Sequence, residues 1–129
     1  MSIASPWAGI EAAQHAPRLP RHPASWDDLA PGSPFLDTIH RGRFPAPLAF
    51  YLFFGARSGS RMMSALGNND GVLTLASVLD SPVGQHARDV FGFYADHTEL
   101  LSDPLVLRRL DLVLAAELDP HRGAELPRR

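Results

Sequence analysis

Two runs of apolar and aromatic side chains stand out from the more polar chain around them. The segment 47–55 reads Pro-Leu-Ala-Phe-Tyr-Leu-Phe-Phe-Gly, and the segment 87–94 reads Ala-Arg-Asp-Val-Phe-Gly-Phe-Tyr. A strand that is covered on both faces needs apolar side chains in succession, which is typical of parallel sheets. We therefore predict strands in these two segments, and the apolar residues 1–4 are a candidate for the end of a third.

The clearest helical pattern lies near the C-terminal end of the chain. Ser102-Asp103-Pro104 is a helix start signal, because a capping side chain precedes a proline in the first turn. Asp119-Pro120 ends the pattern. Between them, apolar side chains recur at helical spacing, namely Leu107, Leu110, Val113 or Leu114, and Leu118. The pattern predicts one helix over 103–118, followed by a flexible tail at 119–129.

The region between residues 13 and 34 carries five prolines, each of which fixes φ and removes a backbone donor. Long regular structure is not expected there, but short helical turns are expected at 9–15, 25–29 and 34–40. Ser25 and Asp27 offer capping oxygens for the second of these turns. The segment 72–79 fits either a short helix or extended chain. Strands that alternate with helical segments predict the α/β class.

Composition excludes several classes of function. The chain has 129 residues, 45% of them hydrophobic and 20% charged, which suits one soluble domain or a piece of one. Its net charge of −2 and the lack of a basic stripe argue against nucleic-acid binding. Without cysteine it has no disulfide, thiolate nucleophile or cysteine zinc site. Its apolar stretches are too short for a transmembrane segment.

Candidate chemistry lies in two loops that follow the predicted strands. The first contains Asn69-Asp70-Gly71 and the second contains Asp96-His97. In an open parallel sheet, ligands bind beyond the carboxyl ends of the strands, so a carboxylate and an imidazole can meet there as an acid–base pair. Each feature also has a purely structural interpretation. Asn-Asp-Gly is an ordinary turn sequence, and a single histidine after a strand is commonly an exposed or capping residue.

Several segments, taken in order, resemble the last third of bacterial esterases and lipases of the α/β-hydrolase superfamily. Residues 3–9 resemble the segment after the sixth strand of that group, and 30–36 resemble part of its cap region. Three further segments resemble the seventh strand, the stretch that carries the triad acid, and the eighth strand with its histidine loop: 51–55, 69–72 and 92–97. The helix from Asp103 fits the last helix of the superfamily.

The resemblance implies that Asp70 is the acid and His97 the general base of a catalytic triad. Acid followed by histidine is the chain order of the superfamily. Asp96 is a weaker candidate for the acid, because adjacent side chains usually point apart. The resemblance also implies one partial domain over 1–129, with a cap-like segment at 10–46 and the last strands and helix at 47–118.

The nucleophile of the superfamily is missing from this chain. That serine normally lies in a Gly-x-Ser-x-Gly elbow, and no such pentapeptide occurs here. Ser58 and Ser60 do not fit the pattern, and they follow the wrong strand. The resemblance places the oxyanion-hole donors before residue 1 as well. We therefore expect the chain to be inactive alone, and to supply acid and base to an esterase completed by an N-terminal hydrolase segment.

Two other functions stay open at this stage. One is a non-catalytic α/β interaction module or an inactive hydrolase remnant that associates with itself or a partner. The other is an esterase that uses a different serine of this chain. The six histidines show no metal-ligand spacing, and no cofactor motif is present, so neither a metal nor a cofactor is expected.

Some residues outside the candidate dyad allow two interpretations each. Arg57 and Arg61 lie near the first loop, where they form either an anion site or a solvated face. Trp7, Trp26 and Phe35 in the N-terminal third either line a substrate groove or pack a cap.

Overall fold

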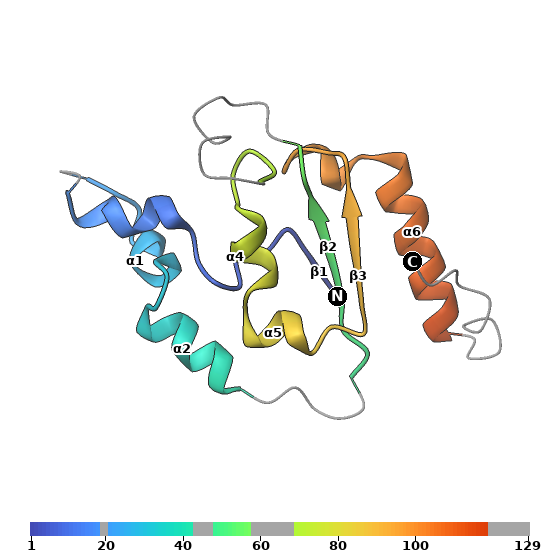
Figure 1. Cartoon of the computed structure of the whole chain (residues 1–129), viewed down its shortest axis with the longest axis horizontal. Coiled ribbons are helices and arrows are strands. Elements are labelled where there is room, and N and C mark those ends of the chain that lie inside the picture. Colours follow the sequence, from blue (N-terminus) through green and yellow to red (C-terminus); the bar gives the residue numbers. More distant parts are fainter. Residues whose placement is uncertain (19–20, 43–47, 58–68, 119–129) are drawn as a thin grey trace.

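A computed structural model describes residues 1–18, 21–42, 48–57 and 69–118 (Figure 1). Its centre is an open sheet of three strands, β1 (Ser2–Ile3), β2 (Tyr51–Gly55) and β3 (Asp89–Phe93), in the order β1-β2-β3. Both strand pairs are parallel, with Ser2 opposite Leu52 and Tyr51 opposite Asp89. The expected architecture of a few parallel strands with flanking helices is therefore confirmed.

The middle strand β2 is buried on both faces, which explains its unbroken apolar sequence. Tyr51 and Phe53 point to one face, where the buried cluster also contains Val106 and Val113. Leu52 points to the other face and forms a second cluster with Val83 and Phe50. Successive side chains of a strand alternate between faces, so a strand with a helix layer on each side has no polar positions.

One helix covers the first face of the sheet, and two short helices cover the second. Helix α6 (Pro104–Leu118) places Val106 and Val113 against β2 and β3, while α4 (Leu75–Leu79) and α5 (Pro82–Gln85) lie on the opposite side (Figure 1). The helix predicted over 103–118 is confirmed, and Asp103 caps it: its Oδ1 accepts a hydrogen bond from the Leu105 amide at 2.7 Å. The ambiguous segment 72–79 is helical from Leu75, because Thr74 caps that helix.

The proline-rich region forms three short helices, as its pattern predicts: η1 (Glu11–Arg18, a 3₁₀ helix), α1 (Ser25–Leu29) and α2 (Pro34–Arg41). The expected caps of α1 are wrong. Its N-cap is Ala24 and no side chain caps it, because Ser25 is already the first helical residue. The Asp27 carboxylate pairs with His22 Nε2 at 3.0 Å. In α2, the Ser33 hydroxyl oxygen accepts from the Leu36 amide at 3.2 Å.

Polar contacts tie the N-terminal helices to α4, beside which they lie in Figure 1. The Ala8 amide donates to the Ser77 carbonyl at 2.7 Å, and the Ser77 hydroxyl donates to the Gly9 carbonyl. The Thr74 hydroxyl donates to Glu11 at 2.6 Å. The cap-like segment is therefore anchored to the helix that follows the Asp70 loop.

The predicted strand boundaries were too wide. Strand β2 begins at Tyr51 rather than at 47, and β3 covers Asp89–Phe93 rather than 87–94, because only five residues of each strand pair in register. Helix α5 was not predicted; it is a single turn that Ser81 caps. Residues 119–129, expected to be a flexible tail, lie outside the described residues. Within the described part of the chain, no helix has the length and apolar character needed to cross a membrane.

Candidate functional site

The two candidate loops meet at the carboxyl end of the middle strand, where Gly55 ends β2. A Cβ atom at position 55 would clash with the Ala95 carbonyl oxygen and would lie 3.2 Å from the Asp70 Cβ atom. Only glycine therefore lets both loops approach the strand this closely. The expectation that a parallel sheet brings the two loops to the same edge is met in the structure.

Asp70 and His97 form a hydrogen-bonded pair across this junction. Nδ1 of His97 lies 2.8 Å from Oδ2 of Asp70, and the His97 backbone amide donates to the Asp70 carbonyl oxygen at 2.9 Å. The Asp70 side chain is 2% exposed and the His97 side chain is 34% exposed. The carboxylate is thus enclosed, while the imidazole reaches the surface.

A tight turn holds the second oxygen of the Asp70 carboxylate. Oδ1 accepts from the Val72 amide at 3.0 Å and from the Leu73 amide at 2.8 Å. The Asn69 side-chain oxygen accepts from the Gly71 amide at 2.9 Å, and Gly71 has a positive φ of 96°. The sequence Asn-Asp-Gly therefore forms the ordinary turn that its composition suggests. The same turn orients Oδ2 of Asp70 toward His97, so the two interpretations are compatible.

A second set of hydrogen bonds shapes the loop that carries His97. Oδ1 of Asp96 accepts from the Thr98 and Glu99 amides at 3.0 and 2.9 Å, and Oε2 of Glu99 accepts from the Asp96 amide at 3.1 Å. This reciprocal arrangement has the bonding pattern of a capping box. It surrounds the beginning of the 3₁₀ turn η2 (Glu99–Leu101), whose N-cap residue is Thr98. Because the Asp96 carboxylate is engaged here, Asp70 and not Asp96 is the partner of the His97 ring.

The geometry determines which ring nitrogen of His97 is available. The acceptor carboxylate of Asp70 faces Nδ1, so the neutral ring carries its proton on Nδ1 and the lone pair on Nε2. No described residue forms a hydrogen bond to Nε2. This arrangement gives His97 the properties of an oriented general base: a free lone pair, and a carboxylate that stabilises the positive charge after the ring takes up a proton.

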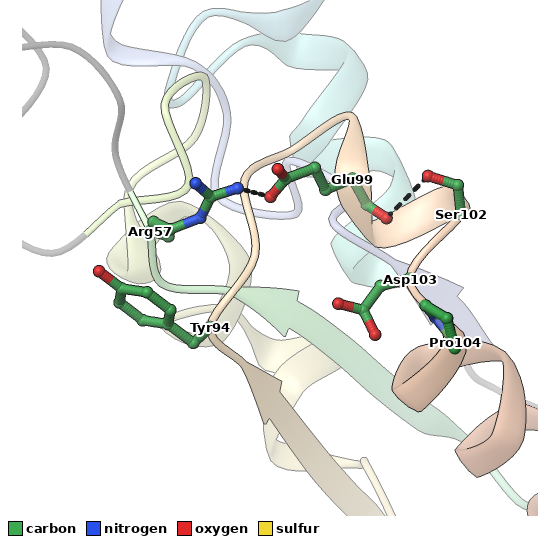
Figure 2. A pocket seen from close by; sticks show the side chains of 6 residues that line it. All are labelled: Arg57, Tyr94, Glu99, Ser102, Asp103 and Pro104. Carbon is green, nitrogen blue, oxygen red and sulfur yellow. Dashed lines mark hydrogen bonds and ion pairs between the residues drawn. The ribbon is translucent and has the colours of Figure 1, made fainter.

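An open pocket of about 460 Å³ lies beside the His97 loop (Figure 2). Its lining consists of Arg57, Tyr94, Glu99, Ser102, Asp103 and Pro104. The Arg57 guanidinium contacts Oε2 of Glu99 and lies 3.5 Å from Oδ2 of Asp96. Arg57 is therefore neither an open anion site nor an isolated solvated cation. Arg61 lies outside the described residues.

The remaining candidates have structural roles or lie outside the description. Trp7 packs edge-on against Phe50, with ring centroids 6.0 Å apart, and its Nε1 donates to the Ser2 hydroxyl oxygen. This contact supports packing for Trp7. Trp26 is half-buried and Phe35 is exposed. Ser58 and Ser60 fall outside the described residues. Across the described ranges, no three His, Asp or Glu side chains gather in a way that could hold a metal ion.

Comparison of the chain with profiles of protein families, with curated protein sequences and with solved structures gives no match. The residues of the site therefore have to carry the functional argument. The sequence analysis did not predict the contact of Arg57 with the capping box. The Asp-x-x-Glu spacing of Asp96 and Glu99, which is typical of a capping box, could have indicated the box itself.

Proposed function

We propose that this chain supplies the acid and base of a serine hydrolase that acts on carboxylic esters. The observation that carries the proposal is the Asp70–His97 pair, in which Nδ1 is engaged and Nε2 has no hydrogen-bond partner among the described residues. Two features support it: the pair lies beyond the carboxyl end of a buried parallel strand, and the chain order of acid and base matches that of esterases and lipases. The nucleophile comes from a separate segment with a Gly-x-Ser-x-Gly elbow.

In the proposed reaction, Nε2 of His97 removes the proton of the serine hydroxyl while the serine oxygen attacks the ester carbonyl carbon. Asp70 stabilises the imidazolium that forms. The imidazolium then gives its proton to the departing alcohol oxygen, which leaves an acyl-serine. Nε2 next takes a proton from water, the hydroxide oxygen attacks the acyl carbon, and the proton returns to the serine oxygen as the acid leaves.

The second candidate is a non-catalytic interaction module, and the surface of α6 favours it. One face of this helix exposes three large apolar side chains: Leu107, Leu114 and Leu118. A contiguous exposed apolar surface often marks a contact with a partner. Both candidates need a partner. They differ in whether His97 does chemistry in the complex.

The test combines this chain with the product of the adjacent upstream reading frame that encodes a Gly-x-Ser-x-Gly elbow. We expect the chain alone neither to hydrolyse p-nitrophenyl acetate nor to react with a fluorophosphonate probe. The mixture is expected to do both, and His97→Gln is expected to lower its kcat roughly 10²–10⁴-fold. His40→Gln is the matched control, because Nε2 of His40 is bonded to the Trp7 carbonyl at 2.6 Å.

Three outcomes contradict the proposal. The first is an adjacent frame without a serine elbow, and the second is a mixture that stays inactive. Both favour the non-catalytic module. The third is hydrolysis by the chain alone that persists in His97→Gln, which would place the chemistry on another residue of this chain.

A further inference from the structure

We propose that Arg57 is a positioning residue for His97: its guanidinium fixes the turn that carries the base to the end of β2. This inference rests on the proposed role of His97 as a general base. It concerns the orientation of the base and not the reaction itself: how a partly exposed loop keeps the His97 imidazole directed at Asp70.

The backbone of Arg57 extends the pairing of β2 into the His97 loop. Two residues past the end of β2, the Arg57 amide donates to the Ala95 carbonyl oxygen at 3.2 Å. One residue earlier, the Ala56 amide donates to the Phe93 carbonyl oxygen at 3.0 Å. The backbone that carries the Arg57 side chain is therefore already hydrogen-bonded to the segment that leads from β3 to His97.

The side chain of Arg57 contacts both acidic residues of the capping box. It meets the Glu99 carboxylate directly (Figure 2), and Oδ2 of Asp96 lies 3.5 Å away. Asp96 and Glu99 bracket His97 in the sequence, and each also accepts from a backbone amide of the turn. The single cation thus contacts the turn on both sides of His97.

Removal of this cation has a specific electrostatic consequence. Two carboxylates that share one small turn repel each other when no positive charge lies between them. Their repulsion loosens the turn on both sides of His97, which leaves the bond between the His97 amide and the Asp70 carbonyl oxygen to hold the backbone there. The Arg57 side chain also lies over the exposed Tyr94 ring, with Cζ 5.9 Å from the ring centroid, which limits where the guanidinium can go.

The same contacts contribute little to global stability. The Arg57, Asp96 and Glu99 side chains are each about one third to one half exposed, and ion pairs with that exposure are screened by water. A positioning role therefore predicts a local change at the His97 ring with little change in melting temperature. A merely structural role predicts the reverse.

The experiment measures the ratio of the two neutral tautomers of His97 by NMR on chain labelled with ¹⁵N-histidine. Wild-type His97 is expected to be mainly in the Nδ1–H form. Arg57→Met is expected to lower the ratio of Nδ1–H to Nε2–H by roughly 2–5-fold, the size of effect of a partly exposed ion pair. Arg57→Lys keeps the charge and is expected to retain most of the ratio.

Two further variants complete the design. Arg41→Met removes another arginine from an ion pair, 3.8 Å from Asp37 on α2, and is expected to leave the ratio unchanged. Glu99→Gln keeps an oxygen for the Asp96 amide but removes the charge that faces Arg57. Arg57 then holds the turn through Asp96 alone, with no repulsion between carboxylates. We expect a shift in the same direction as in Arg57→Met but smaller, and this variant decides the question if Arg57→Met does not fold.

The failures of the two proposals are distinguishable. In one outcome, the wild-type ring is in the Nδ1–H form and neither Arg57→Met nor Glu99→Gln changes the tautomer ratio. This outcome overturns the positioning role alone. A wild-type ring in the Nε2–H form overturns the acid–base pair, and the positioning role with it.

Discussion

Asp70 and His97 are joined by two hydrogen bonds of different kinds. One connects the carboxylate to Nδ1 of the ring at 2.8 Å, and the other connects the two backbones at 2.9 Å. The backbone bond does not depend on either side chain. Substitutions at Asp70 or His97 therefore change the chemistry of the pair while one bond between the two loops is kept.

Asp70→Ala is expected to be destabilising, because the amides of Val72 and Leu73 lose their acceptor inside the protein. Loss of a buried acceptor with several partners costs about 2–4 kcal/mol in the free energy of unfolding. Asp103→Ala is the comparison, since Asp103 also accepts from two backbone amides but caps a more exposed helix end. Its expected cost is about 1 kcal/mol. Urea denaturation measures both, and equal costs would contradict the enclosed role of Asp70.

Gly55→Ala is expected to separate the two loops, because its Cβ atom would meet the carbonyl oxygen of Ala95 and cannot be accommodated by a side-chain rotation. Overpacking of this kind costs roughly 1–3 kcal/mol. Gly92→Ala is the matched control in the neighbouring strand, where the added atom would meet the ring of Phe54, a side chain that can move. The Nδ1 proton signal of His97 should weaken only in Gly55→Ala; its retention there would show that the close approach is not needed.

The stability of the chain is expected to fall as the pH rises from 10 to 12. Burial, and then the hydrogen bond to Glu117 at 2.5 Å, raise the pKa of Tyr51 from 10.0 to about 12. The folded state therefore holds this proton more tightly than the unfolded state. The stabilising contribution is fully present below pH 10 and is lost as the pH rises through 12.

Urea denaturation across this range tests the linkage. Tyr51→Phe is expected to reduce the fall in stability between pH 10 and pH 12. Tyr94→Phe is the control, because the Tyr94 side chain is 83% exposed. An equal slope in wild type and Tyr51→Phe would assign the alkaline loss to other groups.

The chain is expected to self-associate in the absence of other partners. Leu107 and Leu114 are seven residues apart on one face of α6, and they are 43% and 46% exposed. The double variant Leu107→Glu, Leu114→Glu is expected to sediment as a monomer at concentrations where the wild type forms dimers. Leu105→Glu changes an exposed leucine on a different face and serves as the control. A monomeric wild type would contradict this prediction.

Much of the fold could be predicted from the sequence, because burial imposes patterns that are local. The continuous apolar run at Tyr51–Gly55 indicates a strand with both faces covered, and Asp103-Pro104 marks a helix start. The caps of α1 could not be predicted, because the helix begins at Ser25 and so leaves Ala24 at the N-cap position. The sequence pattern shows that a short helix is present but does not fix its first residue.

Part of the candidate site could likewise be predicted from the sequence, and part could not. Asp70 and His97 could be paired because both lie in loops that follow parallel strands, whose carboxyl ends share one edge of the sheet. The expectation that both strands are covered on both faces is wrong for β3, an edge strand whose alternate residues are exposed. The contact of Arg57 with Asp96 and Glu99 joins loops about 40 residues apart in the sequence. No spacing rule connects them. The clash between a Cβ atom at position 55 and the Ala95 carbonyl oxygen also cannot be predicted from the sequence, because it depends on where the loops lie.

The Asp70→Asn variant allows the most direct test of the central claim, that Asp70 orients His97 as a base with its lone pair on Nε2. The amides of Val72 and Leu73 need an oxygen at the Oδ1 position, so the new amide NH₂ group faces Nδ1 of His97. ¹⁵N NMR of the His97 ring measures the tautomer. We expect the Nδ1–H form in the wild type and the Nε2–H form in Asp70→Asn. The same tautomer in both chains would contradict the acid–base pair.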